Sequence, residues 1–182
     1  MKQENFETQC ADGVKLSGIL LIPEKLKAVV QFNCGTATKK EYYLKFLTYL
    51  AENGYLCCLW NYRWTNESDN LKNRDLSYID YGLKDMPAIK SYLDKRFPHL
   101  PFMLIGHSVG GQQIGFMNNL DNVVGNINIA VSSGYWLYMP FKYRMRAYFF
   151  FYVFSPLSAL VYGYIKAKPY GFMENLPTKF VL

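Results

Sequence analysis

The sequence predicts an α/β protein: a mostly parallel, twisted sheet with helices on both faces and an antiparallel hairpin at the N-terminus. Two observations support this class. Two strand-like segments joined by a glycine turn open the chain, and short apolar runs then alternate with amphipathic helical segments. With 182 residues, of which 51% are hydrophobic, the chain is long enough for one domain core and short for two.

The hairpin and the next strand come first. Residues 6–10 and 15–22 are expected to form its two strands, joined by a turn at residues 12–13, and Pro23 ends the second strand. Residues 28–32 form a short apolar run, which is typical of a buried strand.

A first helix is expected over residues 41–53. Its apolar side chains recur at helical spacing, and Gly54 supplies the stop signal. These side chains are Tyr43, Phe46, Leu47 and Leu50. Their stripe is expected to lie on the sheet, and the apolar run at 55–60 is the next strand.

A polar stretch without periodicity, residues 61–77, leads to a second helix expected over 79–97, with Pro87 in its first turns or kinking it. One face of this helix is apolar and carries Leu83, Met86, Ile89 and Leu93. The remaining elements are a strand at 102–105, a helix at 110–118 and a strand at 127–131.

Residues 147–165 contain no charged side chain, and their length is sufficient to span a bilayer. Basic residues flank them: Arg144, Arg146, Lys166 and Lys168. Pro156 is expected to divide the stretch into two short helices, and serine and tyrosine residues interrupt its apolar character. We therefore favour an apolar cap over a pocket, with membrane contact through 147–165 as the alternative.

Composition narrows the function classes. The net charge is +6, but the basic residues are scattered apart from a cluster at 142–146, which argues against a nucleic-acid-binding protein. The four cysteines form no CxxC pair and are expected to be buried thiols of a reducing compartment. The N-terminal segment lacks an apolar signal sequence, so a cytoplasmic location is the default expectation.

The pattern GxSxG stands at residues 106–110, as GHSVG, between the expected strand at 102–105 and the helix that follows. A serine hydroxyl is a weak nucleophile, so it must be exposed and aimed at a carbonyl. In this pattern a sharp strained turn exposes the serine, while the two glycines let strand and helix pack closely. The pattern predicts Ser108 as a nucleophile; a glycine-rich turn without a ligand, or a phosphate cradle, is the alternative.

These residues resemble the α/β-hydrolase superfamily, and within it bacterial predicted hydrolases related to serine aminopeptidase-like and esterase/lipase-like members. The resemblance covers essentially all 182 residues. NYRW at 61–64 is similar to the Asp-Tyr-Arg-Gly of that group, with departures at Asn61 and Trp64, and SGYW at 133–136 is similar to its segment after the sixth strand. The resemblance implies acyl transfer to water through a serine acyl-enzyme, without a metal or organic cofactor.

The resemblance also implies an oxyanion hole made by two backbone N–H groups. One belongs to Val109, which follows the nucleophile. The other is expected at Thr36, in the loop at 33–36 that occupies the place of the family's His-Gly-x segment. Ala37 is the neighbour that replaces Thr36 if the loop differs, and a simple glycine turn is the remaining alternative.

In this family the triad acid and histidine follow the cap in the chain. Neither histidine here is expected to serve, because His107 points away from the Ser108 hydroxyl and His99 lies at the opposite end of the elbow strand. Asp121 is expected near the wrong edge of the sheet. We therefore expect a sequence truncated after the cap and nearly inert, since loss of the base costs subtilisin on the order of a millionfold in turnover.

We expect a hydrolase core over 1–134 and an aromatic-rich cap over 135–182, in which Tyr135 and Trp136 bind a small or lipophilic acyl substrate. Without later strands, the strand at 127–131 becomes a sheet edge, and self-association through that edge is expected. The alternative is a non-catalytic, degenerate hydrolase or fragment that binds a hydrophobic ligand or partner.

Overall fold

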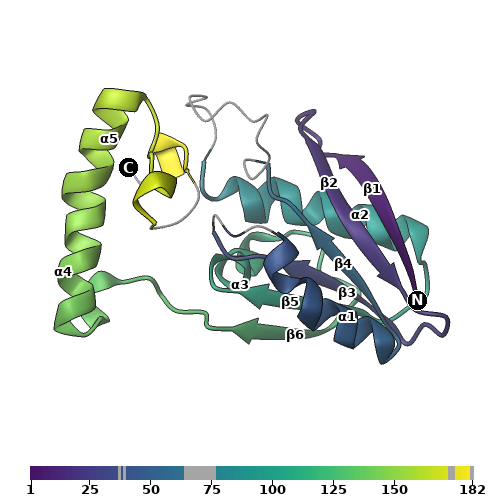
Figure 1. The fold of residues 1–182 in the computed structure, drawn as a ribbon. Coiled ribbons are helices and arrows are strands. Elements are labelled where there is room, and N and C mark those ends of the chain that lie inside the picture. The colour runs from purple at the N-terminus through teal and green to yellow at the C-terminus, as the bar shows by residue number, and fades with distance from the viewer. Residues whose placement is uncertain (37, 39, 64–76, 172–174, 181–182) are drawn as a thin grey trace.

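A six-stranded sheet in the order β1-β2-β4-β3-β5-β6 forms the centre of the computed structural model, which describes residues 1–36, 38, 40–63, 77–171 and 175–180 (Figure 1). The strands are β1 Lys2–Gln9, β2 Lys15–Ile22, β3 Ala28–Asn33, β4 Tyr55–Trp60, β5 Phe102–His107 and β6 Val123–Ile129. The pairs β1–β2 and β2–β4 are antiparallel, whereas β3, β4, β5 and β6 pair in parallel. The predicted N-terminal hairpin and mostly parallel sheet are confirmed.

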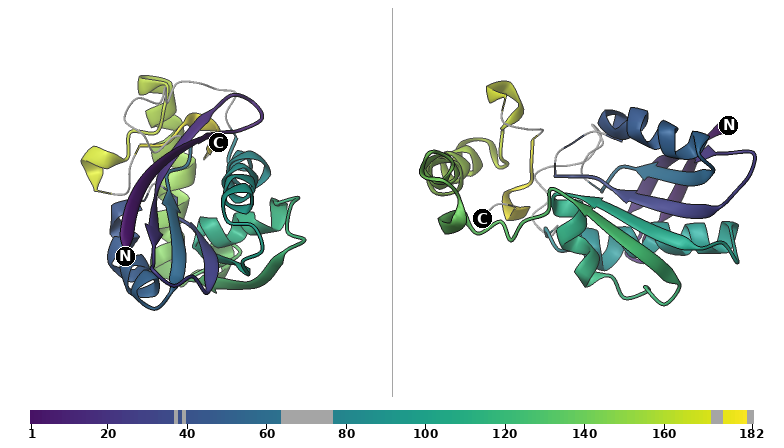
Figure 2. Two further views of the ribbon diagram at one scale, coloured as in Figure 1. Left: turned by 90° about the vertical axis from the view of Figure 1, so that its right-hand side faces the viewer. Right: turned by 90° about the horizontal axis from the view of Figure 1, so that it is seen from below.

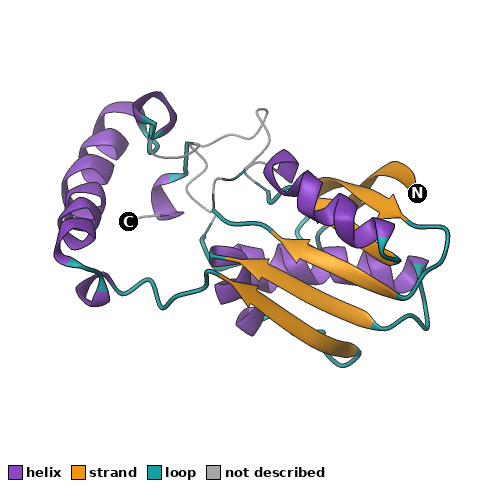
Figure 3. Cartoon of the chain, turned by 60° about the horizontal axis from the view of Figure 1, so that its bottom comes forward, coloured by secondary structure: helices purple, strands orange, loops and turns teal. Residues whose placement is uncertain are grey.

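Helices cover both faces of this sheet, as predicted. Helix α1, Leu44–Glu52, follows a 3₁₀ turn at Lys40–Tyr43 and lies on one face, while α2, Met86–Arg96, and α3, Val109–Gln113, lie on the other (Figure 2, right; Figure 3). The side chains that face the strands are fully buried; they include Leu47, Ala51, Met86, Ile89 and Leu93. Burial of these stripes against the strands makes one continuous hydrophobic core.

β3 and β5 extend one and two residues beyond the prediction, and the bounds of β1 and β6 differ by more. β1 covers Lys2–Gln9 and not 6–10, because its backbone pairs with β2 along its whole length although Phe6 is its only buried hydrophobic side chain. β6 covers Val123–Ile129 and not 127–131, since its parallel pairing with β5 begins at Val123. Both strands lie at edges of the sheet. Many of their side chains are exposed and polar, so the apolar pattern that indicates a strand covers only part of each.

The helix after the elbow is shorter than the predicted 110–118. α3 ends at Gln113, a 3₁₀ turn covers Ile114–Phe116, and Met117 is already extended. Glycine is a poor helix former, and three glycines in this stretch account for the early end.

The second helix begins with a π-helical turn, Tyr81–Asp85, directly before α2. This wider turn shifts the phase of the helix, and Leu83, predicted on the buried face, is 46% exposed. Pro87 is the second residue of α2, directly after the π turn, and this wider turn accommodates the backbone carbonyl that the proline cannot pair. Phe46 on α1, also predicted to face the sheet, is partly exposed.

Beyond the sheet, one continuous helix stands apart from the core (Figure 1). It comprises α4, Phe141–Phe149, a π turn at Phe150–Phe154, and α5, Ser155–Tyr162. The expectation that Pro156 divides this stretch into two helices was wrong. The π turn directly before Pro156 accommodates the backbone carbonyl that the proline cannot pair.

A second, small hydrophobic cluster holds the chain after α5 against this helix. Its buried members are Ile165, Ala167 and Leu176, and the half-buried Phe150, Phe154 and Ala159 pack against them. A single antiparallel bridge pairs Ile165 with Leu176. Within the described ranges, no helix is both long enough and apolar enough to cross a bilayer. The division into a core over 1–134 and a cap over 135–182 stays a prediction.

Within the residues that the structure describes, β6 forms one edge of the sheet. Its apolar side chains are exposed: Val124 is 68% and Ile127 47% accessible to solvent. A parallel strand of this kind is normally covered on both faces. The outer backbone of β6 and these side chains are therefore available to another strand.

A buried ion pair ties the hairpin turn, the end of β4 and the start of α2 together. The Arg63 side chain is 1% exposed. Asp85 accepts two hydrogen bonds from Arg63: one from Nε to Oδ1 at 2.7 Å and one from the backbone N–H to Oδ2 at 3.1 Å. Nη1 of Arg63 donates to Asp12 Oδ2 at 2.9 Å. Burial raises the pKa of Asp85 to about 6, although the guanidinium of Arg63 acts in the opposite direction. Loss of either partner would destabilise the fold, because the remaining charge would be buried without a counter-charge.

Replacing Asp85 by alanine leaves the Arg63 charge buried without its main partner. We expect Asp85→Ala to lower the free energy of unfolding at pH 7 by about 3–5 kcal/mol, measured by denaturant titration. The control is Glu41→Ala, which removes an exposed pair with Lys40 and should change it by less than about 1 kcal/mol. Equal effects of the two substitutions would show that the buried pair is not essential.

Candidate active site

Ser108 occupies the sharp turn between β5 and α3. Its backbone has φ 52° and ψ −120°, a region that side-chain-bearing residues rarely adopt and that costs about 1–3 kcal/mol. Its N–H donates to the carbonyl of Ile129 at 3.0 Å, and its carbonyl accepts from the N–H groups of Gly111 and Gln112 at 3.0 and 3.2 Å. The residue is half-buried. Ser108 is thus held at the start of α3, neither inside the helix nor sealed in the core.

Three glycines around Ser108 permit this turn. A Cβ on Gly106 would overlap the backbone of Gly111, and one on Gly111 would overlap the side chain of Val131. A Cβ on Gly110 would overlap the carbonyl of Asn33 at the end of β3. The start of α3 therefore lies directly against the ends of the neighbouring strands, at the carboxyl edge of the parallel sheet.

The loop after β3 is brought to the same edge. Asn33 pairs with Gly106 in register, and the chain then passes through Cys34 and Gly35 to a turn at Thr36. Thr36 is half-buried, and within the described residues its buried hydroxyl has no hydrogen-bond partner. The loop after β3 lies beside the start of α3, since a Cβ on Gly110 would overlap the carbonyl oxygens of Asn33 and Cys34; an oxyanion hole formed by Thr36 and Val109 stays a prediction. Ala37, the alternative donor, lies outside the described residues.

Neither histidine faces the Ser108 hydroxyl as a base would. His107 Nδ1 lies 2.9 Å from the hydroxyl oxygen of Tyr43, so its ring is engaged with the segment that precedes α1. His99 lies between α2 and β5, at the amino end of β5, whereas Ser108 follows the carboxyl end. Asp121 precedes β6 and is likewise at the amino edge. These placements agree with the sequence-based expectations for all three residues.

The contact between Tyr43 and His107 was missed in the sequence. Helical periodicity treats tyrosine as an apolar residue of the buried stripe, and the Tyr43 ring does pack on Phe32, with 4.6 Å between ring centroids. Its hydroxyl also accepts the N–H of Gly35 at 3.0 Å. No pattern in the sequence indicates where the polar end of a buried tyrosine will point.

The segment after β6 is attached to the elbow helix through Gln112. Its amide nitrogen donates to the carbonyl of Ser132, and its amide oxygen accepts from the hydroxyl of Tyr78 at 2.6 Å. Further along, Tyr135 packs against Tyr138, and Trp136 lies 6.0 Å from the Tyr148 ring centre. Both predicted substrate-binding rings therefore contact cap residues, and their role stays a prediction.

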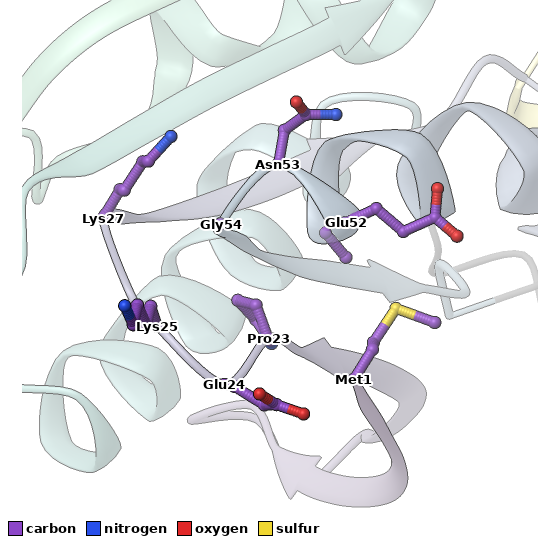
Figure 4. Close-up of a pocket in the computed structure, with 9 residues that line it drawn as sticks. Met1, Pro23, Glu24, Lys25, Lys27, Glu52, Asn53 and Gly54 are labelled. Atoms are coloured by element: carbon purple, nitrogen blue, oxygen red, sulfur yellow. The ribbon is translucent and has the colours of Figure 1, made fainter.

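A hollow at the other end of the sheet is not part of this site. It is lined by Lys25, Glu52 and Asn53, among others, next to the points where β3 and β4 begin (Figure 4). In open α/β sheets ligands bind at the carboxyl ends of the strands, which is where Ser108 lies.

Comparison with protein families identifies a match over the central part of the chain. The family described as serine aminopeptidase, S33, matches residues 24–131, which is more than half of the chain. The matched range includes the loop after β3, the elbow and β6. A search of curated proteins finds no significant match.

Solved structures with the same fold include esterases and other hydrolases. An esterase from Pyrococcus furiosus is 18% identical with a TM-score of 0.60 over 82% of this chain. A thermostable carboxyl esterase from Bacillus coagulans is 17% identical, with a TM-score of 0.57 over 70%. A lidless serine hydrolase from Xanthomonas campestris is 17% identical, with a TM-score of 0.51 over 62%. The chain spans 64%, 44% and 54% of these proteins, respectively.

Two glycine substitutions test the packing of the elbow. Gly110→Ala should lower the free energy of unfolding by at least about 1–3 kcal/mol, because the new methyl group meets the backbone carbonyl of Asn33. Gly115→Ala is the matched control: no atom lies near its Cβ position, so it should be neutral or stabilising by up to about 1 kcal/mol. Thermal or denaturant unfolding of both variants measures this, and equal stability would contradict the close packing.

Proposed function

The chain is an α/β-hydrolase of the serine aminopeptidase S33 family, and from this membership we propose that Ser108 is its nucleophile. The proposed reaction is cleavage of ester or amide bonds of small or lipophilic acyl substrates. The chain spans 44–64% of the length of the compared structures. The hydrolase activity of a whole enzyme is therefore proposed for this chain and is not taken from those structures.

The strained conformation of Ser108 is the observation that carries the proposal. A positive φ at a residue other than glycine persists only where surrounding contacts impose it, and such residues cluster at functional sites. The turn places Ser108, which is half-buried, at the carboxyl edge of the sheet. The N–H of Val109 follows at the start of α3, where the first N–H groups of a helix have no intrahelical partner.

In the proposed reaction the Ser108 oxygen attacks the substrate carbonyl, and the carbonyl oxygen becomes an oxyanion. The N–H groups of Val109 and Thr36 donate to this oxyanion. The bond to the leaving alcohol or amine then breaks, and water releases the acid from the serine ester. The serine proton needs an acceptor, and neither His99 nor His107 is placed to take it. We therefore expect turnover by this chain to be lower by orders of magnitude than in a complete triad.

The substrate class follows from the cap. Its exposed aromatic and aliphatic side chains favour apolar acyl groups over charged ones. They include Tyr135, Phe141, Phe149, Phe151 and Leu157. Tyr135 and Trp136, which join the cap to β6, are the proposed substrate contacts.

A non-catalytic protein that binds a hydrophobic ligand or partner is the second candidate function. The observation that favours it is the lack of a placed base: His99 lies at the amino end of β5, and His107 contacts Tyr43. The exposed apolar side chains of the cap suit either candidate.

Labelling with a fluorophosphonate distinguishes the two candidates. We expect slow modification at Ser108, with loss of fluoride, and acceleration by added imidazole acting as the missing base. Ser108→Ala should abolish labelling, whereas Ser91→Ala, on the exposed side of α2, should not. Mass spectrometry locates the adduct. Absence of Ser108 modification at high imidazole would favour the non-catalytic alternative.

We also propose that copies of the chain associate through the β6 edge. Light scattering after size exclusion should show oligomers, and Ile127→Lys should shift them toward monomer. Leu160→Lys is the control: it alters the cap helix at a side chain that is 83% exposed and should leave the oligomers intact. A monomeric wild-type chain, or dispersal by the control alone, would contradict association through β6.

A further inference from the structure

One buried hydroxyl group connects the two segments of the proposed oxyanion hole. Tyr43 ends the 3₁₀ turn before α1 and is almost completely buried. Its hydroxyl accepts the N–H of Gly35 at 3.0 Å and lies 2.9 Å from Nδ1 of His107, the residue before Ser108. We call these three residues the hydroxyl bridge.

The donors and acceptors of the hydroxyl bridge determine its chemical state. The Tyr43 hydroxyl has one proton; because it accepts from Gly35, this proton is available for Nδ1 of His107. When Tyr43 donates this proton, Nδ1 accepts it and the ring hydrogen lies on Nε2; in the other tautomer Nδ1–H donates to the Tyr43 oxygen, and the contact is kept. Burial raises the pKa of Tyr43, so its hydroxyl keeps the proton. The nearby Thr38 hydroxyl donates its own proton to the carbonyl of Thr36 at 3.2 Å.

The hydroxyl bridge is tightly packed. A Cβ on Gly35 would lie 2.8 Å from His107 Nδ1 and 3.2 Å from the Tyr43 oxygen, so only glycine lets the three groups meet. The Tyr43 ring is held by Phe32 of β3, with 4.6 Å between ring centroids. Packing of the Tyr43 ring in the hydrophobic core thus determines where its hydroxyl group lies.

We propose that Tyr43 and His107 are positioning residues that hold the loop at 33–36 against the elbow and so place the Thr36 N–H where the oxyanion forms. This proposal rests on the proposed function of Ser108. It gives the histidine of the GHSVG motif a role other than that of a base. Loss of one oxyanion donor costs about 10²–10³-fold in rate, and partial misplacement of the loop should cost less.

Tyr43→Phe tests the proposal with little change to the packing, since the ring remains. We expect the rate of Ser108 labelling by a fluorophosphonate, with imidazole present, to fall about tenfold. The control is Tyr49→Phe on α1, whose side chain is exposed and whose labelling rate should equal that of the wild type. Thermal unfolding shows whether both variants remain folded.

Substitutions of His107 separate positioning from simple folding. His107→Asn retains an acceptor near the position of Nδ1 and should label within about threefold of the wild type, whereas His107→Leu should lose about tenfold. Combining Tyr43→Phe with His107→Leu should give no further loss, because both break the same bridge.

Hydrogen exchange of the Gly35 amide supplies a readout that does not depend on Ser108. Tyr43→Phe should accelerate this exchange, because the Gly35 N–H loses its acceptor. Normal labelling by Tyr43→Phe with faster Gly35 exchange would overturn the positioning role alone. Absence of labelling in the wild type would overturn the proposed function of Ser108. Independently of labelling, equal Gly35 exchange in Tyr43→Phe and the wild type would overturn the hydroxyl bridge.

Discussion

The close approach of α3 to the ends of β3 and β6 is the constraint on which the site depends. Gly110 lies against the carbonyl of Asn33, and Gly111 lies against Val131. Because no side chain fits between them, helix and strands meet within one turn, and the residue at that turn must take a positive φ. The strain at Ser108 therefore follows from the packing of its neighbours, and the same packing brings the loop after β3 beside the elbow.

More distant contacts keep these parts in register. The ion pair of Arg63 and Asp85 joins the end of β4 to the start of the second helix. Tyr43 extends from the 3₁₀ turn before α1 to the elbow, and Gln112 attaches the segment after β6. Each of these contacts joins segments far apart in the sequence. The site is thus a property of the whole carboxyl edge of the sheet, and a serine in a glycine-rich turn elsewhere would lack this support.

Strand and helix order, and the elbow, were predictable because apolar runs and the GxSxG pattern are local signals. Other features were not predictable in this way. The π turns at Tyr81–Asp85 and Phe150–Phe154 insert one residue into a helix without changing its composition, so Leu83 and Pro156 were misplaced. In β6, Gly125 and Asn126 separate the first two valines from the predicted apolar run, and an exposed edge tolerates such residues. The hydrogen bonds of Tyr43 depend on tertiary packing, which periodicity does not record.

A crystal structure of the fluorophosphonate adduct tests most directly whether the strained turn serves acyl transfer. We predict a covalent bond from Ser108 Oγ to phosphorus, with the phosphoryl oxygen about 2.7–3.1 Å from the N–H groups of both Val109 and Thr36. An adduct on another side chain, or a phosphoryl oxygen directed away from both N–H groups, would contradict it.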